Sequence, residues 1–513
     1  MQIRHTIVAK ALALSLATGG AAALPACDSD SGSTAVDETP ITLTDQTSWA
    51  ATRARSAAAE SRDPRDPADR AGLLADGFGD QTQNAGEAHI PVVIGDTTAP
   101  DPGPNAHLVT RFVHFADLQL ADDESPARVA AIDGPGLTAS SYRPQDAWMC
   151  LMVDAMVREF NALNASLGLD FIILGGDNAD NAQKNELAWV LQLLGPGGTM
   201  SCDSGADDDP VPGPHNDPKD PFDAAGLDVP YLWVTGNHDV LIQGNLPVSA
   251  ELNDVAVGTR TNQGTRDWSQ PGGPVVNDVD LPADARRALN YPVDVMTTVR
   301  ADGDGHGLDD AAVAGAAANY VWDLPGTPVR FIVLDTAARS GGADGVLKQG
   351  VVDDFLIPAL DEALAEGKYV FTASHHATSS LTDGDQLFGQ YQPDAVLPED
   401  YVALLTSYPN VLFNFVGHSH QHRIRKLEGP EHTVVEVMTS ALADFPHEAR
   451  LLELWDEDNG WLRLRATCID MPIERPLVAE ARALGILDWT SAWADENPSQ
   501  PTDRNVDIYV KKP

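Results

Sequence analysis

Five short apolar segments of strand length recur along the chain, and each ends abruptly in polar residues that can carry chemistry. The segments are 111–116, 171–176, 231–236, 369–374 and 411–417. The residues that follow them are Asp117 and Gln119, Asp177 and Asp180, Asn237 and His238, the pair His375 and His376, and His418 and His420. Apolar runs of this length, bounded by turn residues, favour β-strands. The pattern therefore predicts several reactive side chains at strand ends.

Helix-like stretches separate the predicted strands. Apolar residues between 148 and 163 recur at helical spacing behind Pro144, a residue that suits a first turn. Those between 355 and 364 do the same and stop before Gly367. Alternating strands and helices indicate a layered α/β domain. In such sheets, ligand-binding groups collect beyond the carboxyl ends of the strands.

The strand-end residues share one kind of chemistry when they are taken together. Singly they are weak signals, because Gly-Asp after a strand is usually a turn and a His pair is usually on the surface. Jointly they supply carboxylate, imidazole and amide oxygen, which are the ligands of hydrolytic metal ions. None of the five blocks contains Cys, which disfavours a thiolate zinc site.

In this order the blocks resemble those of the calcineurin-like metallophosphoesterase superfamily. That family's pattern is Asp-x-His, Gly-Asp-x-x-Asp, Gly-Asn-His-Asp/Glu, a lone His, and Gly-His-x-His. The corresponding residues here are Asp117-Leu-Gln119, Gly176-Asp-Asn-Ala-Asp180, Gly236-Asn-His-Asp239, His375 and Gly417-His-Ser-His420. The resemblance covers roughly residues 111–424. It implies an α/β fold in which a layered mixed-sheet β-sandwich is flanked by helices and carries loop insertions.

The resemblance also implies two metal ions, drawn from Mn, Fe, Zn and Mg. The carboxylate of Asp177 would bridge them. The remaining ligands would be Asp117, Gln119 and His420 at the first ion, and Asn237, His375 and His418 at the second. His375 is preferred to His376 because its spacing from Ala377 matches that of the family's ligand.

Two further residues would act in catalysis without binding metal. In the family, a hydroxide that bridges the two ions attacks phosphorus. His238 would stabilise the transition state or protonate the leaving oxygen, and Asp180 occupies the position that orients this His in relatives. His422 continues the alternating face from His420 and is a further candidate for phosphate contact.

Three departures from the family pattern limit what carries over. Gln119 replaces the usual His, so the affinity and identity of the first metal are open. Asn181 stands where phosphoprotein phosphatases carry Arg. Asp180 stands where purple acid phosphatases carry a metal-bound Tyr. The sequence therefore fits neither of these two branches.

The first residues read as a targeting segment. Arg4 and Lys10 precede a small-residue apolar stretch that ends at Cys27 in a sequence resembling a bacterial lipobox. We expect residues 1–26 to be a signal peptide of lipoprotein type, or else an ordinary one with a chance Cys. Cys27 would be acylated, and the protein would be exported and anchored to a bacterial membrane, facing the periplasm or the exterior.

The rest of the chain divides by composition. Residues 27–105 are rich in Ser, Asp, Gly and Pro and predict a flexible tether. Residues 106–470 are expected to form the metallophosphoesterase domain, with insertions near 195–226 and 240–318, and 471–513 a C-terminal extension. Cys150, Cys202 and Cys468 remain after Cys27, so at most one disulfide forms among them.

The charge balance restricts the partners. The chain of 513 residues carries a formal net charge of −43. Such a surface repels nucleic-acid backbones, so no nucleic-acid-binding surface is expected, and membrane association is expected only through the lipid anchor.

We therefore expect a small phosphoester as the substrate. The function expected is metal-dependent hydrolysis of a phosphate monoester or diester. One alternative is a narrow phosphodiesterase acting on cyclic nucleotides or glycerophosphodiesters. Another, of a different class, is a non-catalytic surface-anchored binding protein on a degenerate phosphoesterase scaffold.

Overall fold

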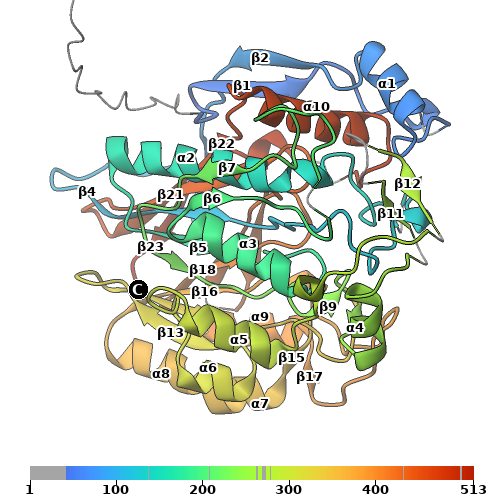
Figure 1. Ribbon diagram of the computed structural model, residues 1–513. Helices are drawn as coiled ribbons and strands as arrows, with labels where there is room; N and C mark the ends of the chain where they lie inside the picture. Colours follow the sequence, from blue (N-terminus) through green and yellow to red (C-terminus); the bar gives the residue numbers. More distant parts are fainter. Residues whose placement is uncertain are drawn as a thin grey trace, which may run out of the picture. The chain divides into compact units, whose positions relative to one another are not determined.

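Two mixed β-sheets form the framework of the chain (Figure 1). The computed structural model describes residues 42–513 except 60, 137, 207, 262–263, 268–272, 278, 431 and 497–498. One sheet has seven strands, in the order β3 (Ile90–Val93), β23 (Val506–Lys511), β22 (Trp461–Asp470), β21 (Glu448–Asp456), β4 (His107–Phe115), β5 (Phe171–Leu174) and β8 (Tyr231–Leu232). Strands β4, β5 and β8 are parallel to one another, so their carboxyl ends share one edge.

The other sheet has six strands. Their order is β13 (Tyr320–Asp323), β14 (Val329–Val333), β16 (Tyr369–Ala373), β18 (Val411–Val416), β20 (Thr433–Met438) and β19 (Arg423–Glu428). The four central strands are parallel, and an antiparallel strand closes each side. All five strands expected ahead of the polar blocks are present.

Aromatic rings from both sheets meet in the layer between them. Phe112 of β4 lies 5.6 Å from Phe331 of β14 and 5.6 Å from Phe415 of β18, each pair edge to face. All three rings are fully buried. Edge-to-face aromatic pairs contribute about 0.5–1.5 kcal/mol beyond their burial. These contacts fix one sheet against the other and so align the strand ends of both.

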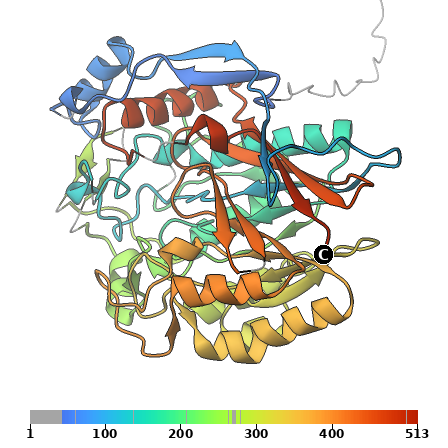
Figure 2. The same ribbon diagram turned by 180° about the vertical axis from the view of Figure 1, so that it is seen from behind.

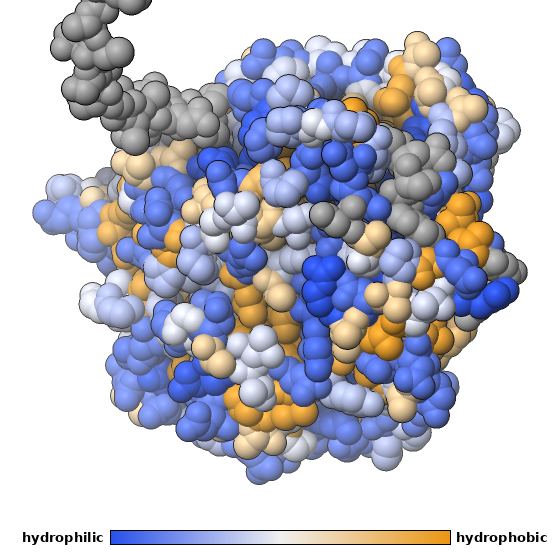
Figure 3. Space-filling view, in the orientation of Figure 1, coloured by the Kyte–Doolittle hydropathy of each residue, from blue (hydrophilic) through white to orange (hydrophobic). Residues whose placement is uncertain are grey.

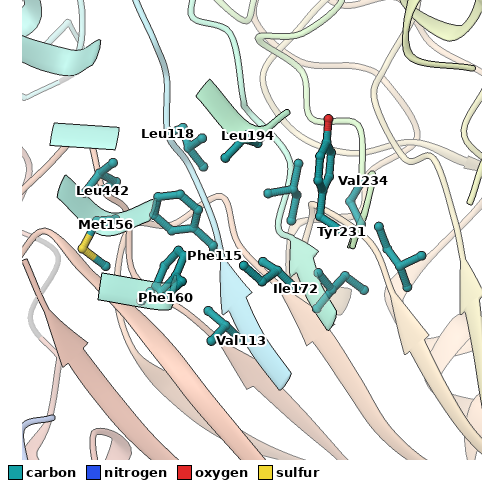
Figure 4. Packing of buried hydrophobic residues seen from close by; sticks show 14 of the residues in the cluster. Val113, Phe115, Leu118, Met156, Phe160, Ile172, Leu194, Tyr231, Val234 and Leu442 are labelled. Carbon is teal, nitrogen blue, oxygen red and sulfur yellow. The ribbon is translucent and has the colours of Figure 1, made fainter. Parts of the chain in front are cut away.

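Helices cover the outer face of each sheet, which confirms the layered α/β sandwich. Helix α2 (Met149–Leu167) packs on the seven-stranded sheet, where Phe115 and Phe160 lie 5.0 Å apart, as the packing in Figure 4 shows. Helix α3 (Lys184–Leu194) contacts α2. Helices α8 (Ile357–Ala365) and α9 (Pro398–Ser407) share an apolar cluster with the six-stranded sheet.

The flexible tether predicted for residues 27–105 is wrong for 42–105. This part contains β1 (Thr47–Ala51), α1 (Pro67–Ala75), β2 (Gln81–Ala85) and β3, and β3 pairs with β23 near the end of the chain. Leu73 of α1 is buried with Leu487 of α10 (Pro476–Thr490), and Figure 2 shows the two segments side by side. Residues 42–105 can be ordered with few apolar side chains of their own, because α10 and β23 supply the rest of the surface that is buried against them. Likewise, 471–513 is part of the fold.

The two insertions carry short elements of their own. The first holds the hairpin β6 (Gly198–Met200) and β7 (Phe222–Ala224), tied to α2 by a disulfide between Cys202 and Cys150. The second holds β9 (Leu241–Ile242), β10 (Leu246–Pro247), α4 (Ala250–Ala256), β11 (Thr265–Arg266), β12 (Val275–Val276), α5 (Pro292–Ala301) and α6 (Asp310–Gly315). The remaining short elements are β15 (Leu347–Lys348), α7 (Gln349–Val351) and β17 (Ala395–Val396). Cys468 is a free, buried thiol.

The predicted signal peptide and Cys27 lie outside the described residues. Among the residues that are described, no helix has both the length and the apolar character needed to cross a membrane. In the view of Figure 3, hydrophilic residues cover most of the surface, with separate apolar patches between them.

Candidate metal centre

The predicted ligands come from both sheets and meet at the carboxyl ends of the central strands. Nε2 of His375, after β16, lies 3.1 Å from Oδ2 of Asp177, after β5. Nε2 of His420, after β18, lies 3.3 Å from Oδ1 of Asp117, after β4. Ligand atoms of Asp117, Asp177 and His375 all fall within 4.8 Å of one another. Gln119, Asn237 and His418 line the same cavity as Asp177 and His420.

The backbone is strained at most of these positions. Five of the seven predicted ligands have positive φ: Asp117 (51°), Gln119 (39°), Asp177 (52°), His418 (75°) and His420 (51°). Non-glycine residues rarely adopt this region, and such outliers persist only where the surroundings hold them, typically at functional sites. The strand ends are therefore bent sharply to turn these side chains inward.

The glycines of the motifs make room for ligands from neighbouring strands. A Cβ at Gly236 would lie 2.0 Å from Oδ1 of Asp177, and one at Gly417 would lie 2.6 Å from Oδ2 of Asp117. Real Cβ atoms do not approach other atoms so closely. The Gly before Asn237 and the Gly before His418 are thus required by the carboxylates of the other blocks.

The preference for His375 over His376 agrees with the hydrogen bonding of the two rings. Nδ1 of His375 faces the carbonyl of Gly175 at 2.7 Å, and its Nε2 points to Oδ2 of Asp177 at 3.1 Å. Both ring nitrogens of His376 are occupied, by the hydroxyl of Thr336 and by the carbonyl of Ala343, each at 2.8 Å. Of the two rings, His375 is the one that directs a nitrogen at the carboxylate of Asp177.

Asn237 is oriented in the same way. Its Nδ2 donates to the carbonyl of Gly244 at 3.0 Å, and its buried Oδ1 has no partner among the described residues. A buried amide oxygen left unpaired is costly unless a cation or another donor meets it. The free oxygen of Asn237 is the feature expected of a metal ligand.

His238 follows, with one ring nitrogen fixed by the main chain and the residue at the cavity. Its main-chain N donates to Oδ1 of Asp177 at 2.8 Å. Its Nδ1 lies 2.6 Å from the main-chain carbonyl of Asp180 and so donates to it, which leaves Nε2 free. The ring lines the cavity that contains Asp177.

The role expected of Asp180 needs a correction of detail. Its carbonyl oxygen, not its carboxylate, holds His238. The carboxylate accepts from Arg128 at 2.8 Å and from Nε2 of Gln243 at 3.1 Å, and its nearer oxygen is 3.6 Å from Nδ1 of His238. The guanidinium of Arg128 holds that carboxylate away from the imidazole.

Two functional candidates were missed by the sequence analysis, Arg143 and Asp444. Nη2 of Arg143 donates to Oε1 of Gln119 at 2.5 Å, and its Nε donates to Asp444 at 2.6 Å. Asp444 in turn pairs with Nδ1 of His420 at 2.6 Å. A carboxylate on the far nitrogen of a ligating His fixes its tautomer and raises its basicity. Both residues lie in loops outside the five blocks, so no motif spacing marks them.

Two other residues near the centre are structural. The carboxylate of Asp239 accepts from the main-chain N of Asn178, Ala179 and Gly236 and so ties two ligand loops together. The predicted phosphate contact by His422 is wrong, because the ring is fully buried and bonded to Glu448 at 2.9 Å.

The charges at the centre keep Asp177 ionised and favour protonated rings at His375 and His420. Burial alone would raise the pKa of Asp177, but the rings of His375 and His238 hold it well below its usual range. Burial opposes charge on His375 and His420 too, yet neighbouring carboxylates raise their pKa values to about 9 and about 10. A bound cation would displace these protons, because imidazole ligates only when its nitrogen is free.

The residues present fit two metal ions, with one reservation at Gln119. Free oxygen and nitrogen atoms and ionised carboxylates converge, and no thiol is among them. The amide oxygen of Gln119, however, already accepts from the cation Arg143. The first position is therefore electrostatically weaker than the second.

A cavity of about 540 Å³ opens directly onto this centre. Asp177, Asn237, His238, His418 and His420 form its floor, and apolar residues form much of its wall. Its volume is in the range of small-molecule sites.

Comparison with known proteins gives weak likenesses. No protein-family model and no curated protein matches the chain. The sulfate thiohydrolase SoxB of Thermus thermophilus aligns at 13% identity and a TM-score of 0.31, covering 75% of this chain and 60% of that one. The purple acid phosphatase PPD1 of yellow lupin aligns at 12% and 0.32, covering 75% and 54%. GAP50, the anchor in the inner membrane complex of Plasmodium, aligns at 10% and 0.28, covering 74% and 95%.

The alignments thus cover less than two thirds of SoxB and of PPD1. With TM-scores this low, they are no basis for an argument about function. The two mixed sheets and the flanking helices agree with the layered α/β sandwich expected from the sequence.

Proposed function

We propose that the chain is a phosphoesterase that holds two metal ions and hydrolyses a phosphate monoester or diester. The observation that carries this proposal is the convergence of Asp117, Asp177 and His375 within 4.8 Å, beside the free oxygen of Asn237. Two cations held there would supply charge to bind a phosphate group and would lower the pKa of a bound water.

The chain's own residues would divide the remaining work. Asp177 would hold both cations and, by accepting from the main chain of His238, fix that residue beside them. Because Nδ1 of His238 donates to Asp180, its Nε2 is the atom available to hold or release a proton towards the cavity. Asp239 would keep the two ligand loops in register.

The test is a panel of phosphate monoesters and diesters assayed with Mn, Zn, Fe or Mg added to metal-free protein. Hydrolysis of at least one ester, dependent on added metal, is the expected result. Cyclic nucleotides and glycerophosphodiesters belong in the panel, because a narrow phosphodiesterase would cleave only one of them.

A non-catalytic binding protein is the competing class. Such a protein would purify with far less than two metals per chain and would cleave no ester. The place of His238 at the cavity, with Nδ1 bonded to the carbonyl of Asp180, favours the enzyme, because a binding role does not need a ring held in this way.

We also propose that the chain is exported and held at a bacterial membrane through Cys27, on the strength of the lipobox-like sequence. The strongly acidic composition supports small phosphoesters, not nucleic acids, as its partners.

A further inference from the structure

Three segments of the chain bring apolar side chains to the cavity at the candidate metal centre. Val129 and Ile132 come from the loop after β4, Ile242 and Leu246 from the second insertion, and Leu387 and Phe388 from the loop after β16. The described residues expose eleven large apolar side chains, and three of these, Ile132, Leu387 and Phe388, line this one cavity. Exposed apolar residues scattered singly need no explanation, but a gathering beside a reactive centre does.

The loop that carries Leu387 and Phe388 is anchored beside the centre. Oε1 of Gln386 accepts from the main chain of Asp344 at 2.8 Å, and its Nε2 donates to the Asp344 carbonyl at 2.9 Å. Oδ1 of Asp344 lies 3.9 Å from Nε2 of His418. The two exposed apolar side chains are therefore held at a fixed place relative to a predicted metal ligand.

The segment that carries Ile132 is also supported from outside the cavity. The guanidinium Nη1 of Arg65 donates to the carbonyls of Ala130 and Ala131 at 3.3 and 3.1 Å, directly before Ile132. Arg65 belongs to the N-terminal segment that packs onto the domain. Both segments are thus built features of the fold.

The charge of the lining restricts what fits there. Among the described residues that line the cavity, none is Lys or Arg, and Asp495 adds a carboxylate beyond the strand-end residues. A second phosphate or a carboxylate on the substrate would meet no cation apart from the metal centre. A neutral apolar group would instead gain from leaving water.

We propose that this cavity selects phosphoesters whose organic group is apolar, an alkyl or aryl chain, and that Ile132, Leu387 and Phe388 contact that group. The proposal rests on the proposed function, since it specifies the substrate class of the same centre.

The test uses p-nitrophenyl alkyl phosphodiesters from methyl to octyl, which keep one leaving group while the chain lengthens. With the metal-loaded protein, kcat/KM is expected to rise about two- to fourfold for each early methylene group, below the micelle concentration of each ester. Titration calorimetry with alkylphosphonates of the same lengths gives a second readout without turnover, and affinity is expected to rise in parallel.

Three variants assign the effect to the walls. Ile132→Ser, Leu387→Ser and Phe388→Asn should flatten the dependence on chain length, with a larger loss of kcat/KM on the octyl ester than on the methyl ester. Phe388 has a φ of 64°, which Asn tolerates well, so that variant should keep its fold. The matched control is Leu364→Ser, since Leu364 is 45% exposed on α8 and does not line the cavity.

The outcomes separate this inference from the proposed function. Hydrolysis with no dependence on chain length, in the wild type and all variants, would overturn the inference alone. Binding of alkylphosphonates that strengthens with chain length, without hydrolysis of any ester, would support the cavity and overturn the proposed function. Comparing a short-chain diacyl phosphoester in monomeric form with a long-chain one in vesicles then tells whether soluble esters or membrane lipids supply the apolar group.

Discussion

Nη2 of Arg143 donates to Oε1 of Gln119 across 2.5 Å, and both side chains are buried. Through Asp444, the same guanidinium is linked to His420, so two ligands of the first predicted metal position share one buried cation. A fixed positive charge at this distance opposes a metal ion at the same amide oxygen. The two metal positions should therefore differ in affinity.

Substitutions at Gln119 test this asymmetry. Gln119→Glu is isosteric and places a negative charge where Arg143 already stands, so it should raise the affinity of the first position by about tenfold. Gln119→Ala should lower it and leave the second position unchanged. Calorimetric titration of metal-free protein resolves the two steps. An affinity of the first position that is the same in the wild type and both variants would mean that Gln119 is not a ligand.

Asp177→Asn should lose both metals, because Asp177 is the only predicted ligand shared between them. Its carboxylate also holds the main chain of His238, so loss of the charge disturbs the catalytic ring as well. Elemental analysis of the purified variant should give well under one metal per chain. Asp154→Asn is the control, since Asp154 is equally buried in α2 and should leave the metal content unaltered. Two metals per chain in Asp177→Asn would remove the bridge from the assignment.

The sequence predicted the strand ends well because apolar runs and polar stops are local signals. Gly236 is an example. A glycine is required at this position for steric reasons, and the sequence shows it directly as the Gly before Asn237. The partners behind the ligands were not predictable in the same way. Arg143 and Asp444 are 301 residues apart and meet only when the two sheets pack together.

The N-terminal segment was misjudged for a related reason. Its composition resembles that of a disordered chain, but β3 needs only one neighbouring strand to be ordered. That neighbour, β23, lies more than 400 residues further along, with Val506 opposite Ile90. Long-range pairing of this kind leaves no mark in a local window of sequence.

Glu159 should make stability depend on pH. Burial raises its pKa from 4.5 to about 7, while Thr42 donates to its carboxylate. The folded state therefore keeps a proton that the unfolded chain releases above pH 4.5. The stability that this proton provides is complete below that pH and is lost as the pH rises to about 7.

Glu159→Gln removes this dependence. As the pH rises from 4.5 to about 7, the variant should become more stable than the wild type. The difference in the free energy of unfolding should reach roughly 3 kcal/mol. Urea unfolding followed at several pH values measures it. Glu399→Gln, at an exposed site on α9, should leave the pH profile as it is. A constant difference between wild type and Glu159→Gln would show that this carboxyl titrates normally.

Cys27→Ser should release the protein from membrane fractions, because a serine cannot take the lipid that a lipobox cysteine receives. Fractionation of cells expressing either form, with detection of the processed chain, measures the effect. Cys468→Ser serves as the control, since that thiol is buried in the fold. Unchanged membrane retention of a processed Cys27→Ser protein would refute the anchor.

His238→Ala should keep both metals and slow alkyl phosphoesters far more than nitrophenyl ones. Nδ1 of the ring donates to the carbonyl of Asp180, so Nε2 is the nitrogen that would give the leaving oxygen its proton. An alkoxide has a high pKa and needs a proton as its bond to phosphorus breaks, whereas nitrophenolate leaves with little help. General acid catalysis contributes about 10²–10⁴-fold, which sets the expected loss of kcat on alkyl esters.

Measuring kcat for both ester types together with metal content decides the role of His238. Equal losses on both would mean that His238 stabilises charge on the phosphoryl group, and loss of a metal ion would make it a ligand instead.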